Sequence, residues 1–417
     1  MAFKIRKPPP SDFRKPRRTA RTVYRGRGNY RSLAINGFRS FADLHLEELG
    51  SINLICGRNN SGKTSLLEAV YAHASGYHFG PFHSQVVLRR SDNSLSGALD
   101  AGEKILSVFR NTDSFPCSFS ISAQLMDDRL THTLTSRFFP SAVLADLDPR
   151  GMGQYSRIAP SGEEMVEQSD VFPNDKALSK VGIKVRPTFV GKWQMQFTGD
   201  KVREVSLQYP PTQGPAFEPF KLAVWSDVLT HRDPTTDIRV FSHLKRYDAL
   251  ETFTEEMQKV YPEIRRIDLI PYPDSTQGPI SIYTKDNKII PLHAFGDGMR
   301  RWFYLLGHMI VYKSAVHCIE EIDSTFHSTA HYELSRLLVS YAQKYSNQLF
   351  MTSHSMEFID TFLKALYAED GILQGSAMDP VRVFTIRRSS EDGGHEVWPL
   401  TGKEAFEKRS QFDLELR

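Results

Sequence analysis

The chain has 417 residues, of which 40% are hydrophobic and 24% charged, a balance typical of a globular protein with room for two or three domains. It contains no run of about 18 apolar residues, which excludes a membrane-spanning helix. The three cysteines, Cys56, Cys117 and Cys318, are widely separated, which excludes a cysteine-based metal pair and predicts a reduced, cytoplasmic setting.

The net charge of +3 conceals a strongly basic beginning. Residues 1–31 hold eleven Lys and Arg residues against one acidic residue, Asp12, and include three consecutive prolines at 8–10. Because this segment has almost no apolar periodicity, we predict a disordered basic arm over residues 1–30. The arm either contacts nucleic-acid phosphates or an acidic partner surface, or it is a solvated tail.

From residue 31 the sequence becomes strand-like. The segment INLIC at 52–56 is followed by GRNNSGKT at 57–64 and then by apolar residues at helical spacing. This is a full G-x-x-x-x-G-K-[ST] pattern between a strand and a helix, the setting that a phosphate-binding loop requires. Its glycines let backbone N–H groups turn toward phosphates at a helix N-terminus, where the helix dipole favours anions. A chance glycine-rich turn is the alternative.

Within this loop we predict that Lys63 contacts the β- and γ-phosphates and that the Thr64 hydroxyl is a Mg²⁺ ligand. The other loop residues expected to bind the nucleotide are Gly57, Asn59, Asn60, Ser61, Gly62 and Ser65.

The middle of the chain has a weaker pattern. Alternating segments at 117–125 and 129–137 predict a β-hairpin beside the nucleotide-binding lobe. Prolines predict a loop at 209–220, and helices are expected at 225–232 and 247–261. No heptad repeat lasts for three turns, so a long coiled-coil arm is not expected.

An apolar strand at 315–319 ends in Glu320 and Glu321, with Asp323 close behind. Unpaired carboxylates are costly to bury, so Lys63 and a metal ion are expected to compensate them. Ligands of parallel sheets bind beyond the carboxyl ends of the strands, where these side chains emerge. We predict that Glu320 holds Mg²⁺, directly or through water, and that Glu321 orients or deprotonates the attacking water. A solvated acidic cluster is the alternative.

Other segments flank this strand. FGDGMRRWFYLL at 295–306 begins with glycines and continues as a helix with one apolar face. MTSHS at 351–355 places His354 after another apolar strand, where an imidazole can sense a γ-phosphate, although a structural histidine is the alternative. Asp-Gly-Gly predicts a hairpin between 381–388 and 395–400.

Two further clusters carry weaker signals. His327 and His331 share a helix face but have no third ligand, so zinc is not expected. Asp146 and Asp148 form a D-x-D without a preceding acidic strand, so a metal-dependent nuclease site is not expected there.

Taken in this order, the motifs resemble those of the ABC-type ATPases of the OLD, SMC and RecF kind, in the branch with an AAA-type domain. The resemblance covers about residues 31–135 and 290–365 and includes FRSF at 38–41. It implies an α/β fold, namely an ABC-type ATPase head with a P-loop parallel-sheet core and an antiparallel β lobe. The implied domains are the basic arm at 1–30, an N-terminal lobe with the Walker A motif at 31–140, an α+β insertion at 141–290, and a C-terminal lobe with the signature, Walker B, D-loop and switch histidine at 291–417.

The resemblance also implies binding and hydrolysis of ATP with Mg²⁺. It makes Glu321 and His354 the catalytic residues and Thr64 and Glu320 the metal ligands. Five further residues join the expected nucleotide-binding set, namely Arg39, Gly296, Asp297, Gly298 and Arg300.

The sequence departs from the family pattern at three positions. Glu320 stands where the metal-binding residue is usually aspartate, and Thr325 stands where glycine is common. The third is the Gly296–Gly298 segment, which lacks the serine hydroxyl that touches the partner's γ-phosphate in transporters. Either Arg300 or Arg301 supplies that contact, or both pair with acidic neighbours on a solvated helix face.

In this family the composite site forms when two heads sandwich ATP, which implies a homodimer or a higher oligomer. Only 63 residues follow His354, too few for a TOPRIM nuclease domain. Stand-alone ATPases of this length resemble components of anti-phage systems of the PARIS or RloA type, which act with a separate nuclease. The first hypothesis is therefore a sensor and scaffold for such an effector, triggered by a phage protein. The second is a DNA-repair or DNA-end-binding ATPase of the RecF or SMC type, and the third is a binding module with a structural nucleotide.

Overall fold

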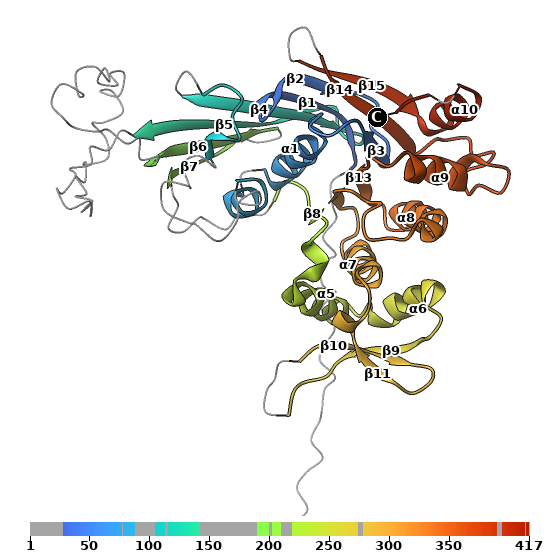
Figure 1. The fold of residues 1–417 in the computed structure, drawn as a ribbon. Coiled ribbons are helices and arrows are strands. Elements are labelled where there is room, and N and C mark those ends of the chain that lie inside the picture. Colours follow the sequence, from blue (N-terminus) through green and yellow to red (C-terminus); the bar gives the residue numbers. More distant parts are fainter. Residues whose placement is uncertain are drawn as a thin grey trace, which may run out of the picture.

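The computed structural model describes residues 28–76, 78–87, 105–112, 116–141, 190–199, 202–209, 219–273, 278–389, 394–412 and 414–416. The arm predicted over residues 1–30 lies almost entirely outside them, as do Asp146 and Asp148. Within the described residues, three sheets and their helices form the molecule (Figure 1).

The antiparallel sheet has six strands in the order β2-β1-β4-β5-β6-β7. Burial alternates along β4, where Cys117, Phe119, Ile121, Ala123 and Leu125 are buried, as expected for a sheet with one buried face. That face packs on α1 (Lys63–Ser75), α2 (Phe79–Phe82) and the π-helix η1 (His83–Val87). The strands are β1 (Tyr30–Phe38), β2 (Phe41–Leu46), β4 (Cys117–Leu125), β5 (Thr131–Ser141), β6 (Val190–Thr198) and β7 (Arg203–Tyr209).

The core sheet has the order β15-β14-β3-β13-β12-β8, and all its neighbouring pairs are parallel except β14 with β15. Every residue of β3, β12 and β13 is buried, because α1 covers one face and the helices α7, α8 and α9 cover the other. The strands are β3 (Ile52–Cys56), β8 (Ala223–Ser226), β12 (Val316–Ile319), β13 (Gln348–Thr352), β14 (Val381–Arg388) and β15 (His395–Thr401), and the helices are α7 (Asp297–Val311), η4 (Ser328–Ala330), α8 (His331–Lys344), α9 (Met356–Tyr367) and α10 (Gly402–Phe412).

A small antiparallel sheet, β11-β10-β9, lies with α5 and α6 on the side of α7 that faces away from the core sheet (Figure 1). Helix α5 begins where Asp233 accepts a hydrogen bond from the amide of Thr235 and Pro234 occupies the first turn. The elements are η2 (Thr230–Arg232), α5 (Pro234–Arg246), α6 (Leu250–Val260), β9 (Ile264–Leu269), β10 (Ile280–Thr284), β11 (Ile289–Pro291) and η3 (Leu292–Ala294).

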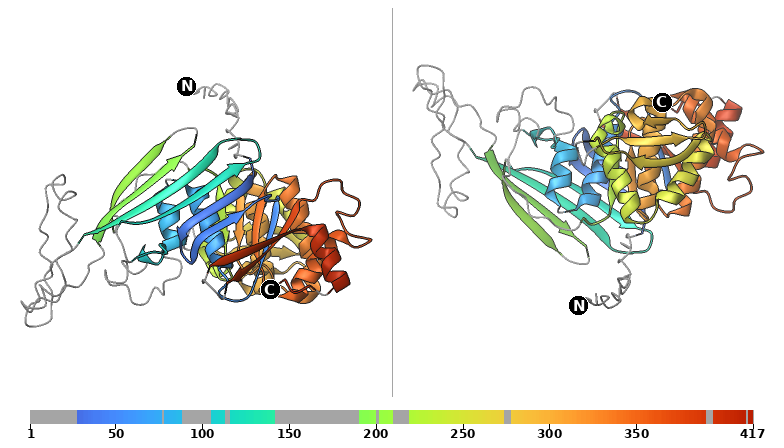
Figure 2. Two further views of the ribbon diagram at one scale, coloured as in Figure 1. Left: turned by 90° about the horizontal axis from the view of Figure 1, so that it is seen from above. Right: turned by 90° about the horizontal axis from the view of Figure 1, so that it is seen from below.

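The residues predicted to form an insertion, 141–290, contribute strands to all three sheets. Strands β6 and β7 extend the antiparallel sheet, which reaches to one side of the core sheet (Figure 2), and β8 pairs with β12. The helix expected at 225–232 is wrong: Trp225 and Ser226 end β8, because pairing with β12 outweighs local helix preference. The helix expected at 247–261 is confirmed as α6. The domain boundaries at 30, 140 and 290 stay a prediction.

Candidate nucleotide-binding site

The phosphate loop, residues 57–64, joins the end of β3 to the start of α1. Gly57 has a φ of 144° and Gly62 a φ of 98°, conformations that side chains rarely adopt. A Cβ on Gly62 would lie 2.8 Å from the ring of Phe41, so glycine is required there. In the described part of the chain no side chain caps α1, and its first amide groups are therefore oriented to bind an anion.

The remaining loop residues divide by exposure. Asn59 and Asn60 are exposed at the tip, and Asn60 has a left-handed φ of 63°. Ser61 is buried, and its amide donates a 3.2 Å hydrogen bond to the carbonyl of Arg58. Ser65 is buried in the first turn of α1. The loop thus exposes its asparagine tip while its two serines pack inward.

Lys63 folds back over the loop. Its Nζ donates to the carbonyl oxygens of Gly57 at 2.6 Å and Arg58 at 2.9 Å. Burial lowers the pKa of Lys63, and the charges of Glu321 and Asp323 are among those that oppose this effect. The ammonium group therefore lies between the phosphate loop and the acidic end of β12.

The two predicted metal ligands are in contact. The Thr64 hydroxyl donates a hydrogen bond to Oε1 of Glu320, although the residues are 256 positions apart. A hydroxyl and a carboxylate are hard oxygen donors, and Mg²⁺ in phosphate sites takes few protein ligands beside water and phosphate oxygens. The pair therefore fits Mg²⁺. Among the residues that the structure describes, no group of three or more His, Cys, Asp or Glu side chains could hold a metal.

The turn at residues 320–327 follows β12 and has a constrained backbone. Glu321 has a φ of 46° and Thr325 a φ of 74°, both in the left-handed region. The amide of Glu321 donates to Oγ1 of Thr352 at 2.9 Å, and the amide of Ile322 donates to the Thr352 carbonyl at 3.0 Å. The last residue of β13 thus fixes the conformation of the turn that carries the predicted catalytic glutamate.

His354 lies two residues beyond Thr352. It is exposed, and within the described residues its imidazole makes no hydrogen bond. Ser355 caps α9 by accepting from the amide of Phe358 at 3.2 Å. His354 therefore follows the strand whose last residue, Thr352, is hydrogen-bonded to the turn that contains Glu321. Its side chain is exposed to solvent.

Two cations lie among the carboxylates of this edge. One is Lys63, and the other is Arg301 of α7, whose charge interacts with Asp323, Asp227, Glu321 and Glu320 in decreasing order. Burial lowers the pKa of Arg301 to about 10, which leaves the guanidinium charged at neutral pH. Arg301 thus compensates the partly buried carboxylates together with Lys63, in line with the predicted alternative that this arginine pairs with acidic neighbours.

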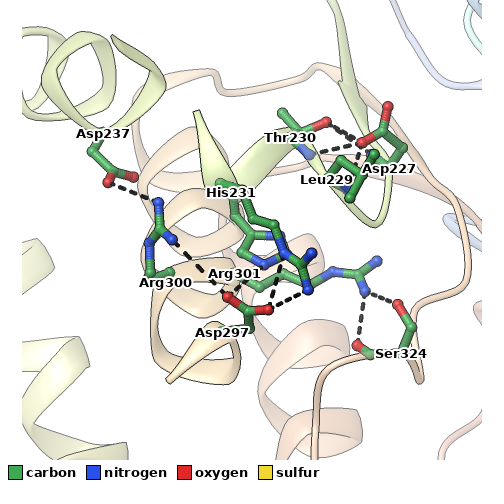
Figure 3. Close-up of polar contacts among 10 residues, drawn as sticks. Asp227, Leu229, Thr230, His231, Asp237, Asp297, Arg300, Arg301 and Ser324 are labelled. Atoms are coloured by element: carbon green, nitrogen blue, oxygen red, sulfur yellow. Dashed lines mark hydrogen bonds and ion pairs between the residues drawn. The ribbon is translucent and has the colours of Figure 1, made fainter. Parts of the chain in front are cut away.

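The signature residues surround the first turn of α7 (Figure 3). Asp297 accepts from Arg232 Nη2 at 2.5 Å and lies 3.6 Å from Nε2 of His231, which is buried. A Cβ on Gly296 would meet no described atom within 4 Å, whereas one on Gly298 would lie 3.2 Å from the carbonyl oxygen of Thr325. Gly298 therefore packs on the turn at 320–327, and Gly296 borders open space.

Neither signature arginine lies on a solvated face. Arg300 is 8% exposed, and its guanidinium lies 3.7 Å from Asp237 and 4.0 Å from Asp297. Arg301 is fully buried. The structure thus supports pairing of Arg300 with acidic neighbours, and its role at a nucleotide stays a prediction.

Arg39 also makes internal contacts. Its Nε donates to Glu68 of α1 at 2.8 Å, and its other nitrogens donate to Ser107 and to the carbonyl of Val86. Arg39 is 9% exposed and Glu68 is fully buried. These contacts tie the β1–β2 turn to α1 and give no support to the predicted nucleotide contact.

His395 of β15 is a residue of the site that the sequence analysis missed. Its Nε2 lies 3.4 Å from the position of a Cβ on Gly62, and its ring packs edge-on to Phe41 at 4.8 Å. Thr352 was likewise missed. Both reach the site through strand pairing, so no local pattern around them could have indicated it.

Comparison with known families gives two matches. A family model described as "AAA domain, putative AbiEii toxin, Type IV TA system" matches residues 220–360, and a model described as "AAA domain" matches residues 32–74. The first covers β8 to the beginning of α9, and the second covers β1 to α1. Together the two matches include the phosphate loop, the signature segment and the turn at 320–327.

Three curated relatives illustrate the sequence similarity. An "ATP/GTP phosphatase" of Helicobacter pylori is 24% identical over 362 residues, which are 81% of this chain and 89% of that protein. The "DNA replication and repair protein RecF" of Idiomarina loihiensis is 33% identical over 82 residues, 20% of this chain and 23% of RecF. The RecF protein of Shewanella baltica is 42% identical over 64 residues, 15% of this chain and 18% of RecF. The chain therefore spans less than a quarter of each RecF relative.

Among solved structures, an SMC head bound to the C-terminal winged-helix domain of ScpA covers 91% of this chain and 99% of its own, with 13% identity and a TM-score of 0.46. The SMC head domain of Thermotoga maritima covers 89% and 99%, with 11% identity and a TM-score of 0.39. No helix in the described ranges has the length and apolar character to cross a membrane. The predicted α/β class, with a parallel core and an antiparallel lobe, is confirmed. The chain therefore has a phosphate loop with Thr64 and Glu320 in contact beside it, and it is similar to AAA-domain proteins over residues 32–74 and 220–360.

Proposed function

We propose that this chain binds ATP with Mg²⁺ at the phosphate loop and hydrolyses it in an oligomer. The observation that carries the proposal is the contact between Thr64 and Glu320, which brings both predicted ligand oxygens to one point beside the loop. The relative named ATP/GTP phosphatase, which aligns with 81% of this chain, supports the reaction.

Each residue then has a defined task. Lys63 exchanges the carbonyls of Gly57 and Arg58 for phosphate oxygens, while Thr64 and Glu320 hold the metal. Mg²⁺ held by these two residues would supply positive charge to the phosphate oxygens. Glu321 orients the attacking water and accepts its proton, and His354 contacts the γ-phosphate. The Gly296–Gly298 segment of a second copy closes the site.

The substitution Glu321→Gln tests this assignment. Loss of the water-activating carboxylate should lower kcat by a factor of about 100 or more, while the intact phosphate loop keeps ATP affinity within about threefold. Phosphate release and binding of a fluorescent ATP analogue measure the two effects. Glu407→Gln, at an exposed position of α10, is the matched control and should behave as wild type. Wild-type turnover in Glu321→Gln would refute the catalytic assignment.

For the biological role, we propose a cytoplasmic sensor and scaffold of an anti-phage system, which controls a separate effector such as a TOPRIM-type nuclease. Residues 220–360 match a family model whose description names a toxin of a toxin–antitoxin system, and this match supports the role. A DNA-repair ATPase of the RecF type is the second candidate, favoured by the local RecF matches and by the basic arm.

One experiment separates the two roles. The chain is expressed with its neighbouring genes, purified, and assayed for a co-purifying protein and for stimulation of ATP turnover by DNA. The defence role predicts a stoichiometric nuclease partner and no DNA stimulation. The repair role predicts DNA-stimulated turnover that is lost when residues 1–30 are deleted, because the arm supplies phosphate contacts.

A further inference from the structure

Arg301 joins the signature helix to the catalytic edge within one subunit. From the second turn of α7, its Nη2 donates to the carbonyl oxygen of Glu320 at 2.7 Å. Its Nη1 donates to the carbonyl oxygen of Ser324 at 2.8 Å and also to the Ser324 hydroxyl (Figure 3). One side chain thus holds both ends of the segment that contains the proposed catalytic Glu321.

The same two elements touch at two further points. Gly298 packs against the carbonyl of Thr325, where a Cβ would come within 3.2 Å. The guanidinium of Arg301 also lies 5.9 Å from the ring centroid of Phe326. The first two turns of α7 therefore pack against the turn at 320–327 along its length.

The chemistry of arginine suits this position. Its planar fork donates to several oxygen atoms in a fixed geometry, which the single ammonium of lysine cannot reproduce. A shorter side chain would leave the partly buried carbonyls of Glu320 and Ser324 without their charged donor, which costs free energy. The charges of four carboxylates, Asp323, Asp227, Glu321 and Glu320, act on the guanidinium and favour its charged form.

Arg301 is fully buried, and its Nη atoms bind oxygen atoms of its own subunit. A direct contact of this residue with a partner's nucleotide would require those hydrogen bonds to break. The geometry favours an internal role.

We propose that Arg301 is a positioning residue that couples α7 to the turn at 320–327, so that engagement of the signature segment by a second copy's nucleotide orients Glu321 in the same subunit. The inference rests on the proposed ATPase function and adds its regulation: hydrolysis in one site depends on occupancy of the neighbouring site. Coupling of this kind requires one structural element whose conformation depends on the occupancy of both sites. Helix α7 with its attached turn is that element.

The substitution Arg301→Lys tests the coupling in the full-length chain. We expect the ATP affinity to stay within about threefold of wild type and kcat to fall by about tenfold or more. The rate should also lose its cooperative dependence on ATP concentration and follow simple saturation. Hydrogen exchange of residues 320–327 should become faster, because the turn loses its attachment. Arg409→Lys is the matched control, since Arg409 makes comparable bonds to Asp360 and the Leu414 carbonyl on the surface of α9 and α10.

A second variant keeps the proposal testable if Arg301→Lys does not fold. Ser324→Ala removes only the hydroxyl contact from a partly exposed turn, and it should shift kcat and exchange in the same direction by a smaller factor. In the double variant the two effects should fall short of additive, because both remove one shared interaction. Wild-type kcat and exchange in Arg301→Lys, or strictly additive effects, would overturn the proposal.

The outcome is distinct from failure of the proposed function. If the wild-type chain binds ATP without turnover, the ATPase proposal fails. In that case faster exchange at 320–327 in Arg301→Lys still supports the coupling, and unchanged exchange overturns it.

Discussion

At the scale of single residues, opposite charges lie close together in this site, where the carboxylates are partly buried. Lys63 and Arg301 lie among the carboxylates that follow β12, and Thr64 satisfies Glu320 directly. Arg300 and Asp237 form a second partly compensated pair, 3.7 Å apart and both buried. Such pairs contribute little net stability, because desolvation offsets most of their attraction.

Asp237 leads to a prediction about pH. Burial raises its pKa to about 7 against the attraction of Arg300, so the folded chain retains a proton that the unfolded chain releases above about pH 4. Stability should therefore fall as pH rises from about 4 to about 7. Asp237→Asn removes this loss, and its free energy of unfolding should exceed that of wild type by on the order of 2 kcal/mol at pH 8 and match it near pH 4.

Urea denaturation at several pH values measures this difference. Asp360→Asn is a suitable control, because it removes an exposed carboxylate from a surface arginine pair and should change stability only slightly. A constant difference between Asp237→Asn and wild type at all pH values would contradict the assignment of a raised pKa.

At the scale of elements, the loops that follow β3, β12 and β13 meet at one edge of the core sheet. Each of these strands is fully buried, and the phosphate loop, the turn at 320–327 and His354 follow their carboxyl ends. The parallel order of the three strands brings those residues together. The hydrogen bond between Thr352 and the amide of Glu321 fixes the turn at 320–327 relative to the end of β13.

This arrangement explains what could be predicted from the sequence. The phosphate loop and the acidic strand end were predictable because each is a local pattern with its own chemistry, and parallel pairing then places Thr64 beside Glu320. The contacts of Arg301, Arg39 and His395 were not predictable, because they depend on which side chains meet across elements far apart in the chain. The short strand β8 was mistaken for a helix because the contacts that stabilise it, such as pairing with β12, come from residues far away in the chain.

At the scale of the whole molecule, the signature segment lies at the N-terminus of α7, which also carries Arg301. Gly296 borders open space in a single subunit, since a Cβ there would meet no described atom within 4 Å. Its backbone is extended, with a φ of −64°, and therefore accepts any side chain. A second copy that brings its nucleotide to this segment would occupy that space.

Gly296→Leu should therefore disrupt assembly without disturbing the subunit. The added side chain meets open space in the monomer, so we expect the melting temperature to change by no more than a few degrees and ATP binding to stay within about threefold of wild type. Because the same side chain blocks the approach of a partner's phosphates, ATP-dependent oligomerisation should be lost and kcat should fall by at least about tenfold.

Light scattering during size-exclusion chromatography, with and without Mg²⁺–ATP, measures the assembly in the Glu321→Gln background, where bound ATP persists. If Gly296→Leu in that background still assembles with ATP as its parent does, the signature segment does not face a second nucleotide. In that case the coupling through Arg301 would have no partner contact to transmit.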